Sequence, residues 1–261
     1  MIMIKKFLLL IIFFTTKLIF AQNEVLDKYP YGQDFYAGGL NQLNKEMVKV
    51  VKELKLLPCE KSEERYNVKI LVYENSTINY VKDFDIVDIQ KNKCAFNFSR
   101  KIIPHLKRWM PAKVNGKFIG AITKIEINPF YLVNSKDDPS KNKKENPTFK
   151  KGIKAFGFEI KSIFERYIKK NEDKRALLTF VVNENGEMVD FEIEGDFFDY
   201  EKKDIINSLS KIKGKWNPAT FNNIPIRAKI RQPIFQQFDL QIELEDQNKI
   251  MDQNFHNNSY R

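Results

Sequence analysis

The chain contains two stretches in which apolar positions follow the same succession of helical and strand periods. In the first stretch the order is helix, strand, strand, helix, strand, over residues 40–54, 68–72, 78–87, 98–106 and 119–127. In the second stretch the same order recurs over residues 160–168, 177–182, 189–193, 205–212 and 226–234. The pattern predicts an α+β protein made of two tandem α-β-β-α-β domains, each a small three-stranded antiparallel sheet packed by two helices.

Turn-forming residues set the limits of several of these elements. Asn185-Gly186 separates two strands of the second stretch and predicts a hairpin, because both residues tolerate positive φ. Pro104 interrupts a helical stripe in the first stretch, and Pro inside a helix removes a hydrogen bond. Gly214 follows the last helical stripe and is predicted to cap that helix.

The two stretches also share residues, around a Trp-x-Pro-Ala motif. The motif recurs 107 positions later and comprises Trp109, Pro111, Ala112, Trp216, Pro218 and Ala219. Four further identities at the same offset are Asn115/Asn222, Ile119/Ile226, Ala121/Ala228 and Ile127/Ile234. Unrelated sequences would share about one identity over this span. Because a packed Trp buries a large apolar area, we interpret the motif as structural rather than as a ligand-stacking site.

The N-terminal segment is interpreted as a secretory signal peptide, cleaved after Ala21. Two Lys precede the unbroken apolar run Phe7–Phe14, as in such peptides. An uncleaved membrane anchor is the alternative, but Phe7–Ala21 is shorter than the roughly 20 apolar residues of a span and contains Lys17. Cleavage removes three Lys and no acidic residue, so it lowers the formal net charge from +10 to +7.

These features divide the chain into five predicted parts. They are a signal peptide (1–21), a first domain (22–133), a linker (134–146), a second domain (147–238) and a polar tail (239–261). The linker is polar and contains Pro139, which is typical of a connection between domains. The tail has alternating apolar residues at its start, and the rest has too little apolar content to pack, so we expect it to be mobile.

The two Cys of the chain are predicted to form one disulfide. Cys59 precedes the first strand of the first stretch and Cys94 follows the second strand. Antiparallel strands bring such ends together, and export would expose both thiols to oxidants. Two free thiols remain the alternative.

The residue types leave little material for catalysis or for a cofactor. The chain has two His, and neither is clustered with Cys or carboxylates at ligand spacing, so we predict no metal site. No Gly-rich phosphate loop or nucleophile elbow occurs, and alternating acids such as Glu192 and Glu194 are typical of the wet face of a strand. Lys and Arg are spread along the chain, which argues against nucleic acid as a partner. We therefore expect neither an enzyme nor a cofactor-binding protein.

The order of elements and several motifs resemble the C-terminal domain of TonB, in two tandem copies. The resemblance covers about residues 29–132 and 147–238. It rests on Tyr29-Pro30-Tyr31-Gly32 before the first helix, Asn183-Glu184-Asn185-Gly186 in a hairpin, Trp109 to Gly116, the weaker Trp216 to Asn223, and the late Pro233-Ile234-Phe235. The family binds partners by strand addition, in which an extended peptide pairs with the last strand at a sheet edge.

The resemblance implies partner-binding edges at Lys117–Asn128 and Ile224–Phe235. In the second copy the expected edge residues are Ile226, Arg227, Ala228, Lys229, Ile230 and Arg231. Alternatively, these Lys and Arg form a solvated face that discourages edge aggregation, or the edge is covered within the chain, by the other copy or by the tail at Asp239–Glu245. The function expected is that of an exported, non-enzymatic, periplasmic protein that binds an envelope protein or peptide and contacts membrane at most indirectly. The alternative is an inner-membrane-anchored energy transducer of TonB-dependent outer-membrane transport.

Overall fold

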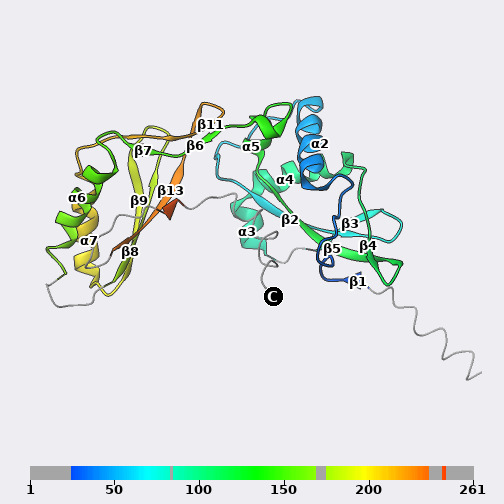
Figure 1. Ribbon diagram of the computed structural model, residues 1–261, viewed down its shortest axis with the longest axis horizontal. Coiled ribbons are helices and arrows are strands. Elements are labelled where there is room, and N and C mark those ends of the chain that lie inside the picture. Colours follow the sequence, from blue (N-terminus) through cyan, green and yellow to red (C-terminus); the bar gives the residue numbers. More distant parts are fainter. Residues whose placement is uncertain (1–24, 83–84, 169–174, 235–242, 245–261) are drawn as a thin grey trace, which may run out of the picture. The chain divides into compact units, whose positions relative to one another are not determined.

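The computed structural model describes residues 25–82, 85–168, 175–234 and 243–244, and it has the mixed α+β composition that the sequence predicts (Figure 1). It contains two compact units. One comprises the chain up to Met47 together with Tyr66–Ile127, and the other comprises Val48–Arg65 together with the chain from Asn128 onward. The predicted signal peptide and almost all of the predicted tail lie outside the described residues. Within the described ranges, no helix has the length and apolar content needed to cross a membrane.

Helices and strands alternate along both halves of the chain. The first half contains β1 (Val25–Leu26), α2 (Gly39–Glu53), β2 (Tyr66–Val72), β3 (Ile78–Tyr80), α3 (Ile86–Lys91), α4 (Lys93–Ile102), η1 (Ile103–His105), β4 (Ala112–Val114) and β5 (Lys117–Ile127). The second half contains α5 (Pro129–Val133), η2 (Pro139–Lys141), β6 (Lys144–Glu145), β7 (Thr148–Phe149), α6 (Ile153–Phe164), β8 (Ala176–Val182), β9 (Met188–Gly195), α7 (Asp199–Leu209), β10 (Trp216–Asn217), β11 (Ala219–Phe221), β12 (Ile224–Ile226), β13 (Ala228–Ile234) and β14 (Glu243–Leu244).

The sheet of the first unit has the order β1-β5-β2-β3, with β4 paired to β5. Its β5-β2-β3 part is antiparallel, as the alternating pattern predicts. The sheet is larger than the three predicted strands, because β1 adds in parallel at Gly120 and Ala121. Val68, Ile70 and Val72 are at most 1% exposed, so one face of β2 lies in the core.

The predicted second strand at 78–87 is too long, because a helix begins within that range. β3 ends at Tyr80 and α3 starts at Ile86. The carboxylate of Asp85 accepts a hydrogen bond from the backbone N–H of Asp88, which caps α3 at its N-terminus. The interruption at Pro104 is confirmed, since α4 ends at Ile102 and continues as the short helix η1.

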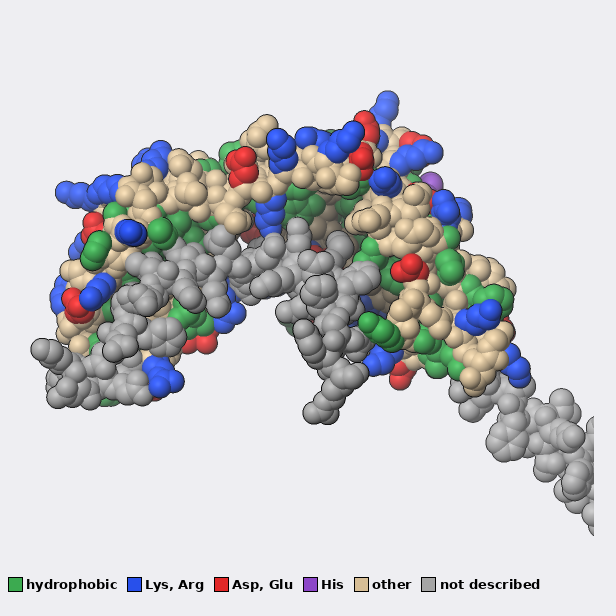
Figure 2. Space-filling view, viewed as in Figure 1, with side chains coloured by type: hydrophobic (Ala, Val, Ile, Leu, Met, Phe, Trp, Pro, Cys, Tyr) green, Lys and Arg blue, Asp and Glu red, His purple; other side chains and the backbone are tan. Residues whose placement is uncertain are grey.

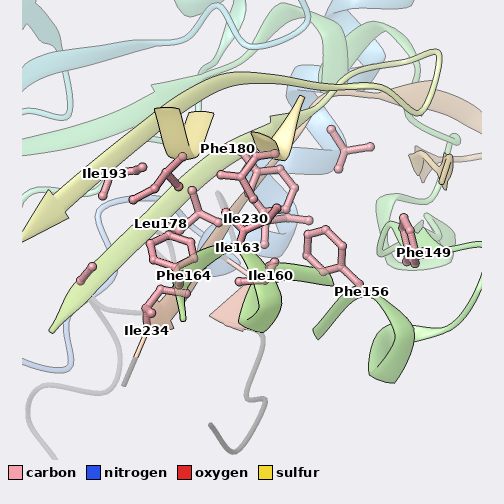
Figure 3. Close-up of a cluster of buried hydrophobic side chains, with 14 of the residues drawn as sticks. Phe149, Phe156, Ile160, Ile163, Phe164, Leu178, Phe180, Ile193, Ile230 and Ile234 are labelled. Atoms are coloured by element: carbon pink, nitrogen blue, oxygen red, sulfur yellow. The ribbon is translucent and has the colours of Figure 1, made fainter. Parts of the chain in front are cut away.

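The sheet of the second unit has the order β14-β13-β8-β9 and is antiparallel throughout. Figure 3 shows side chains of α6 pointing toward those of β8, β9 and β13. The buried members of this cluster are Phe149, Phe156, Ile160, Ile163, Phe164, Ala176, Leu178, Phe180, Val182, Ile193, Phe197, Ile205, Leu209, Trp216, Ile230 and Ile234. The apolar stripes of α6 and α7 therefore form one core with a single face of the sheet.

Strand pairing repeats between the two halves of the chain, with an offset of 107 for β5 and β13, as in the motif, and of 110 for β2 and β8. β2 pairs with β5 from Val72↔Ala121 to Tyr66↔Ile127, and β8 pairs with β13 from Val182↔Ala228 to Ala176↔Ile234. The short hairpins match as well, with Ala112↔Ile119 in β4–β5 and Ala219↔Ile226 in β11–β12. Asn115 and Asn222 both have φ of 50° in the turns of these hairpins. Such turns need positive φ, so the repeated Asn has a conformational reason.

Two features of the second unit differ from the sequence expectations. The predicted linker 134–146 contains η2 and β6, and β6 pairs with β11, because a polar segment can still form a sheet-edge strand. Gly214 does not cap α7, whose C-cap is Ser210. A Cβ atom at Gly214 would lie 2.1 Å from the ring of Phe149, so this glycine allows a close approach to the core.

Candidate partner-binding edge

The six residues expected at the binding edge do not lie in one strand. Ile226 ends β12, which pairs with β11, whereas Ala228 begins β13, which pairs with β8. Arg227 lies between the two strands. Ile226 is buried with Ala219 and Phe221 in a small cluster of its own, apart from the main core. The alternation of apolar and basic residues continues without interruption from β12 into β13. The sequence around Arg227 therefore gives no sign that the chain passes from one sheet to another there.

One side of β13 is fully paired, and the other side is paired at two positions with the described part of the C-terminal segment. β8 pairs with all seven residues from Ala228 to Ile234. On the opposite side, which we call the β13 edge, β14 pairs antiparallel with Ile230 and Arg231. Among the described residues, no other strand pairs with this edge. The expectation that the tail at Asp239–Glu245 could cover the edge thus has a structural counterpart at β14.

Side chains of β13 alternate between the core and the partly exposed face. Ile230 and Ile234 are 0% exposed and belong to the main core. Lys229 and Arg231 are half-buried and alternate with them, as successive side chains of a strand do. Of the predicted edge residues within β13, Ile230 therefore supports the fold, whereas Lys229 and Arg231 each keep part of their surface exposed.

Arg227 is engaged by three carboxylates of the second unit. Its Nη2 lies 2.6 Å from Oδ2 of Asp190, its Nε lies 3.8 Å from Glu63, and its Nη1 lies 4.0 Å from Glu184. Asp190 has φ of 53° near a register irregularity between β8 and β9. Arg227 thus binds groups within its own chain, which favours a structural role for this member of the predicted edge.

Replacing Arg227 with Ala is expected to lower the free energy of unfolding by about 1 kcal/mol, because partly exposed ion pairs each contribute little. Urea denaturation measures the change. Arg231→Ala is the matched control, and its expected effect is within about 0.5 kcal/mol. Equal stability of the two variants would contradict the structural role of Arg227.

The repeated Trp-x-Pro-Ala motif lies in the core of both units. Trp109 is 5% exposed and its ring meets the ring of Tyr36 edge-on, with centroids 5.3 Å apart. Trp216 is 2% exposed, and its ring lies 4.9 Å from that of Phe156. Ala112 and Ala219 are buried, and Pro111 and Pro218 are half-buried. This burial agrees with the structural interpretation of the motif.

A polar cluster around Tyr36 escaped the sequence reasoning. The Tyr36 hydroxyl donates a hydrogen bond to Glu46, which also accepts one from Gln42 (2.8 Å) and lies 3.6 Å from Arg108. Burial, together with the Glu46 carboxylate, raises the pKa of Tyr36 above its usual range. The hydroxyl therefore keeps its proton at neutral pH and acts as a donor rather than as a base. Only the helical spacing of Gln42 and Glu46 hinted at the cluster.

Cys59 and Cys94 form a disulfide, as predicted from their positions beside the first two strands. Cys59 is 5% exposed. A disulfide sulfur lacks the thiolate charge that metal coordination requires, so neither Cys is a metal ligand in this state. Glu192 and Glu194 are exposed on β9, as expected for the wet face of a strand.

Surface charge points to no particular class of ligand. On the face shown in Figure 2, the described Lys and Arg side chains are dispersed among acidic and uncharged ones. Such dispersion differs from the clustered basic footprint that nucleic-acid-binding proteins carry. Comparison with known proteins adds no candidate ligand, since no protein-family model, curated protein or solved structure matches the chain.

Proposed function

We propose that this chain is an exported, non-enzymatic cell-envelope protein that consists of two tandem TonB C-terminal-like domains and binds a protein partner by strand addition at the β13 edge. The sequence motifs supply the resemblance, and the recurrence of the β2–β5 pairing as the β8–β13 pairing supports a duplicated unit. The disulfide between Cys59 and Cys94 is compatible with an oxidising compartment outside the cytoplasm.

The observation that carries the proposed binding mode is the pairing of β14 with β13. An edge strand offers unpaired N–H and C=O groups, and an extended peptide binds by satisfying them. β14 does this at Ile230 and Arg231, on the side of β13 opposite β8. The β13 edge therefore has a backbone geometry that accepts a further strand, and a partner peptide would use the same groups.

The partly exposed basic residues of β13 fit either recognition or protection of the edge. Lys and Arg on an edge strand discourage uncontrolled pairing between sheets. The same side chains give specificity when a particular peptide is added, because side chains beside the new strand select its sequence. Protection alone predicts no specific partner, so the two roles differ in a measurable way.

Site-specific photo-crosslinking in the native envelope tests the proposal. A photoreactive residue at position 231, in place of Arg231, is expected to yield one discrete adduct with an envelope protein, whose crosslinked site lies in a short extended segment. The matched control carries the photoreactive residue at position 192, in place of Glu192, on β9 at the other side of the same sheet. The same adducts from both positions, or none from position 231, would overturn the proposal. Mass measurement of the native N-terminus distinguishes this protein, which starts at Gln22, from an anchored transducer that retains Met1.

A further inference from the structure

The matching hairpins of the two units differ in what lies on their outer side. In the second unit, β6 lies beside β11 and extends the β11–β12 hairpin to three strands (Figure 1). In the first unit, β5 is an inner strand at the expected edge Lys117–Asn128, because it pairs with β2 on one side and with β4 and β1 on the other. Among the described residues, no strand pairs with β4 on the side away from β5, which we call the β4 edge.

The chain before each hairpin runs beside it, but over different lengths. In the second unit this antiparallel pairing extends from β7–β10 to β6–β11. In the first unit the corresponding bridge is Tyr36↔Trp109, but the chain on the N-terminal side of Tyr36 leaves the hairpin in a turn. Gly32 has φ of 76° in this turn, and a hydrogen bond of 3.2 Å from the Gln33 N–H to the Pro30 carbonyl closes it. The segment that would correspond to β6 therefore does not lie along β4.

A side chain takes the place of the missing strand at Lys113. The Gln33 Nε2 donates a hydrogen bond to the Lys113 carbonyl at 2.7 Å, and Gln33 Oε1 accepts one from the Lys113 N–H at 2.8 Å. A neighbouring antiparallel strand would make the same two bonds with its backbone. In the second unit the added segment also bonds to the turn, since the Asn222 N–H donates to the Lys143 carbonyl at 2.8 Å. A strand at the β4 edge could thus replace Gln33 and also reach Asn115, the counterpart of Asn222.

The side chain that faces the added strand differs in charge between the two hairpins. In the second unit the Thr220 hydroxyl donates a hydrogen bond to the Glu145 carboxylate of β6 at 3.2 Å. Lys113 is the counterpart of Thr220 at the offset of 107. Lys113 is exposed, and its ammonium lies 5.7 Å from the ring of Phe118, the facing residue on β5. A carboxylate that faces a Lys across two strands stabilises their pairing, so the position that Glu145 fills in the second unit suits an acidic residue in the first.

We propose that the β4 edge is a second strand-addition site, at which an extended segment of another protein pairs antiparallel with β4, places an Asp or Glu opposite Lys113 and displaces the Gln33 side chain. The occupant comes from outside the chain because the chain's own segment is held in its turn, where the Tyr29 hydroxyl donates to the Met110 carbonyl at 2.6 Å. The site lies in the first unit and depends neither on β13 nor on the tail.

NMR titration of the isotope-labelled chain starting at Gln22 tests the site with the blocked peptide Thr-Val-Glu-Val-Thr. The peptide should shift the backbone amide signals of Lys113 and Asn115. Gln33→Ala removes the competing amide, so the peptide should bind this variant about fivefold more tightly or more, because two hydrogen bonds no longer have to be exchanged. The matched control is Gln90→Ala, a change at an exposed side chain of α3, and this variant should bind like the unchanged chain.

A charge reversal tests the preference for an acidic residue. Lys113→Glu should weaken binding of Thr-Val-Glu-Val-Thr by about fivefold or more and should favour the peptide Thr-Val-Lys-Val-Thr instead. The matched control is Lys117→Glu, because Lys117 pairs with Val114 and its side chain lies on the opposite face of the hairpin from Lys113. This control should change binding by less than about twofold at physiological salt, where charges at a distance are screened. Circular dichroism verifies that both variants are folded.

Each failure has a separate meaning. Unshifted Lys113 and Asn115 amide signals in both the unchanged and the Gln33→Ala chains would overturn the β4 edge as a site. Equal binding by these two chains would overturn the role of Gln33. Equal binding of the Glu and Lys peptides to the unchanged chain would overturn the acidic ligand. The photo-crosslinks from positions 231 and 192 test the β13 edge separately, so failure of one site leaves the other to be decided by its own experiment.

Discussion

Replacing Trp216 with Ala is expected to lower the free energy of unfolding by about 3–5 kcal/mol, the range for truncation of a large buried aromatic side chain. Trp216 is 2% exposed. Its ring lies 5.4 Å from that of Phe149 and 5.9 Å from that of Phe180, so its loss would leave a cavity between segments from three parts of the chain. Urea denaturation followed by circular dichroism measures the change.

Substitution by Phe separates packing from hydrogen bonding at the two repeated Trp residues. The Trp109 Nε1 donates a hydrogen bond to the Leu106 carbonyl at 2.9 Å. Trp216 Nε1 is buried, and within the described structure it has no hydrogen-bond partner. Trp216→Phe should therefore destabilise less than Trp109→Phe, which leaves a carbonyl without its donor. If Trp216→Ala cost no more than Phe158→Ala, a change at a side chain that is 73% exposed, the core role of Trp216 would be wrong.

Local patterns predicted the longer helices and strands, because the periodicity of apolar residues that marks them is a local property of the sequence. Apolar alternation identified β2 and β8, whose alternate residues are buried, and helical spacing identified α2 and α6. The hairpin at Asn185-Gly186 was also predictable, although only Gly186 of the two residues takes a positive φ, of 76°. The offset of 107 between the two Trp-x-Pro-Ala motifs also predicted strand register. The pair Ala112↔Ile119 in β4–β5 recurs at this offset as the pair Ala219↔Ile226 in β11–β12.

Pairings between distant segments had no such local signal. The parallel addition of β1 to β5 joins segments far apart in the chain, and no motif in either strand indicates that the two pair. The start of α3 depends on Asp85, which is compatible with either a turn or a helix cap. The role of Gly214 depends on Phe149, a residue far away in the sequence.

The sequence predicted a strand at the candidate edge but not the contacts of its residues. The alternation of basic and apolar residues indicated the strand that the structure contains as β13, but it could not reveal the carboxylates that engage Arg227. Those carboxylates come from Glu63, Glu184 and Asp190, which are far from Arg227 in the sequence. In the same way, the sequence showed that apolar residues alternate at the start of the tail. Only the structure showed that Leu244 and Glu243 pair with Ile230 and Arg231.

Replacing both Cys59 and Cys94 with Ser is expected to lower the free energy of unfolding by about 3–4 kcal/mol in the chain-entropy description of disulfides. The bond closes the part of the chain that contains β2, β3 and α3, so its removal gives the unfolded chain more conformations. Denaturant unfolding of the oxidised chain and of the double variant measures the difference. Replacing both residues avoids a lone thiol, which could form intermolecular disulfides.

The unchanged chain supplies its own control when the disulfide is reduced. In dithiothreitol its stability should fall to that of the double variant, and the stability of the double variant should not respond. Thiol titration of the denatured, unreduced chain should find no free thiol. Two titratable thiols, or a double variant as stable as the oxidised chain, would mean that the bond adds nothing to the fold. A match between the reduced chain and the double variant would instead attribute the whole loss to the crosslink, because the side chains at both positions are then almost isosteric.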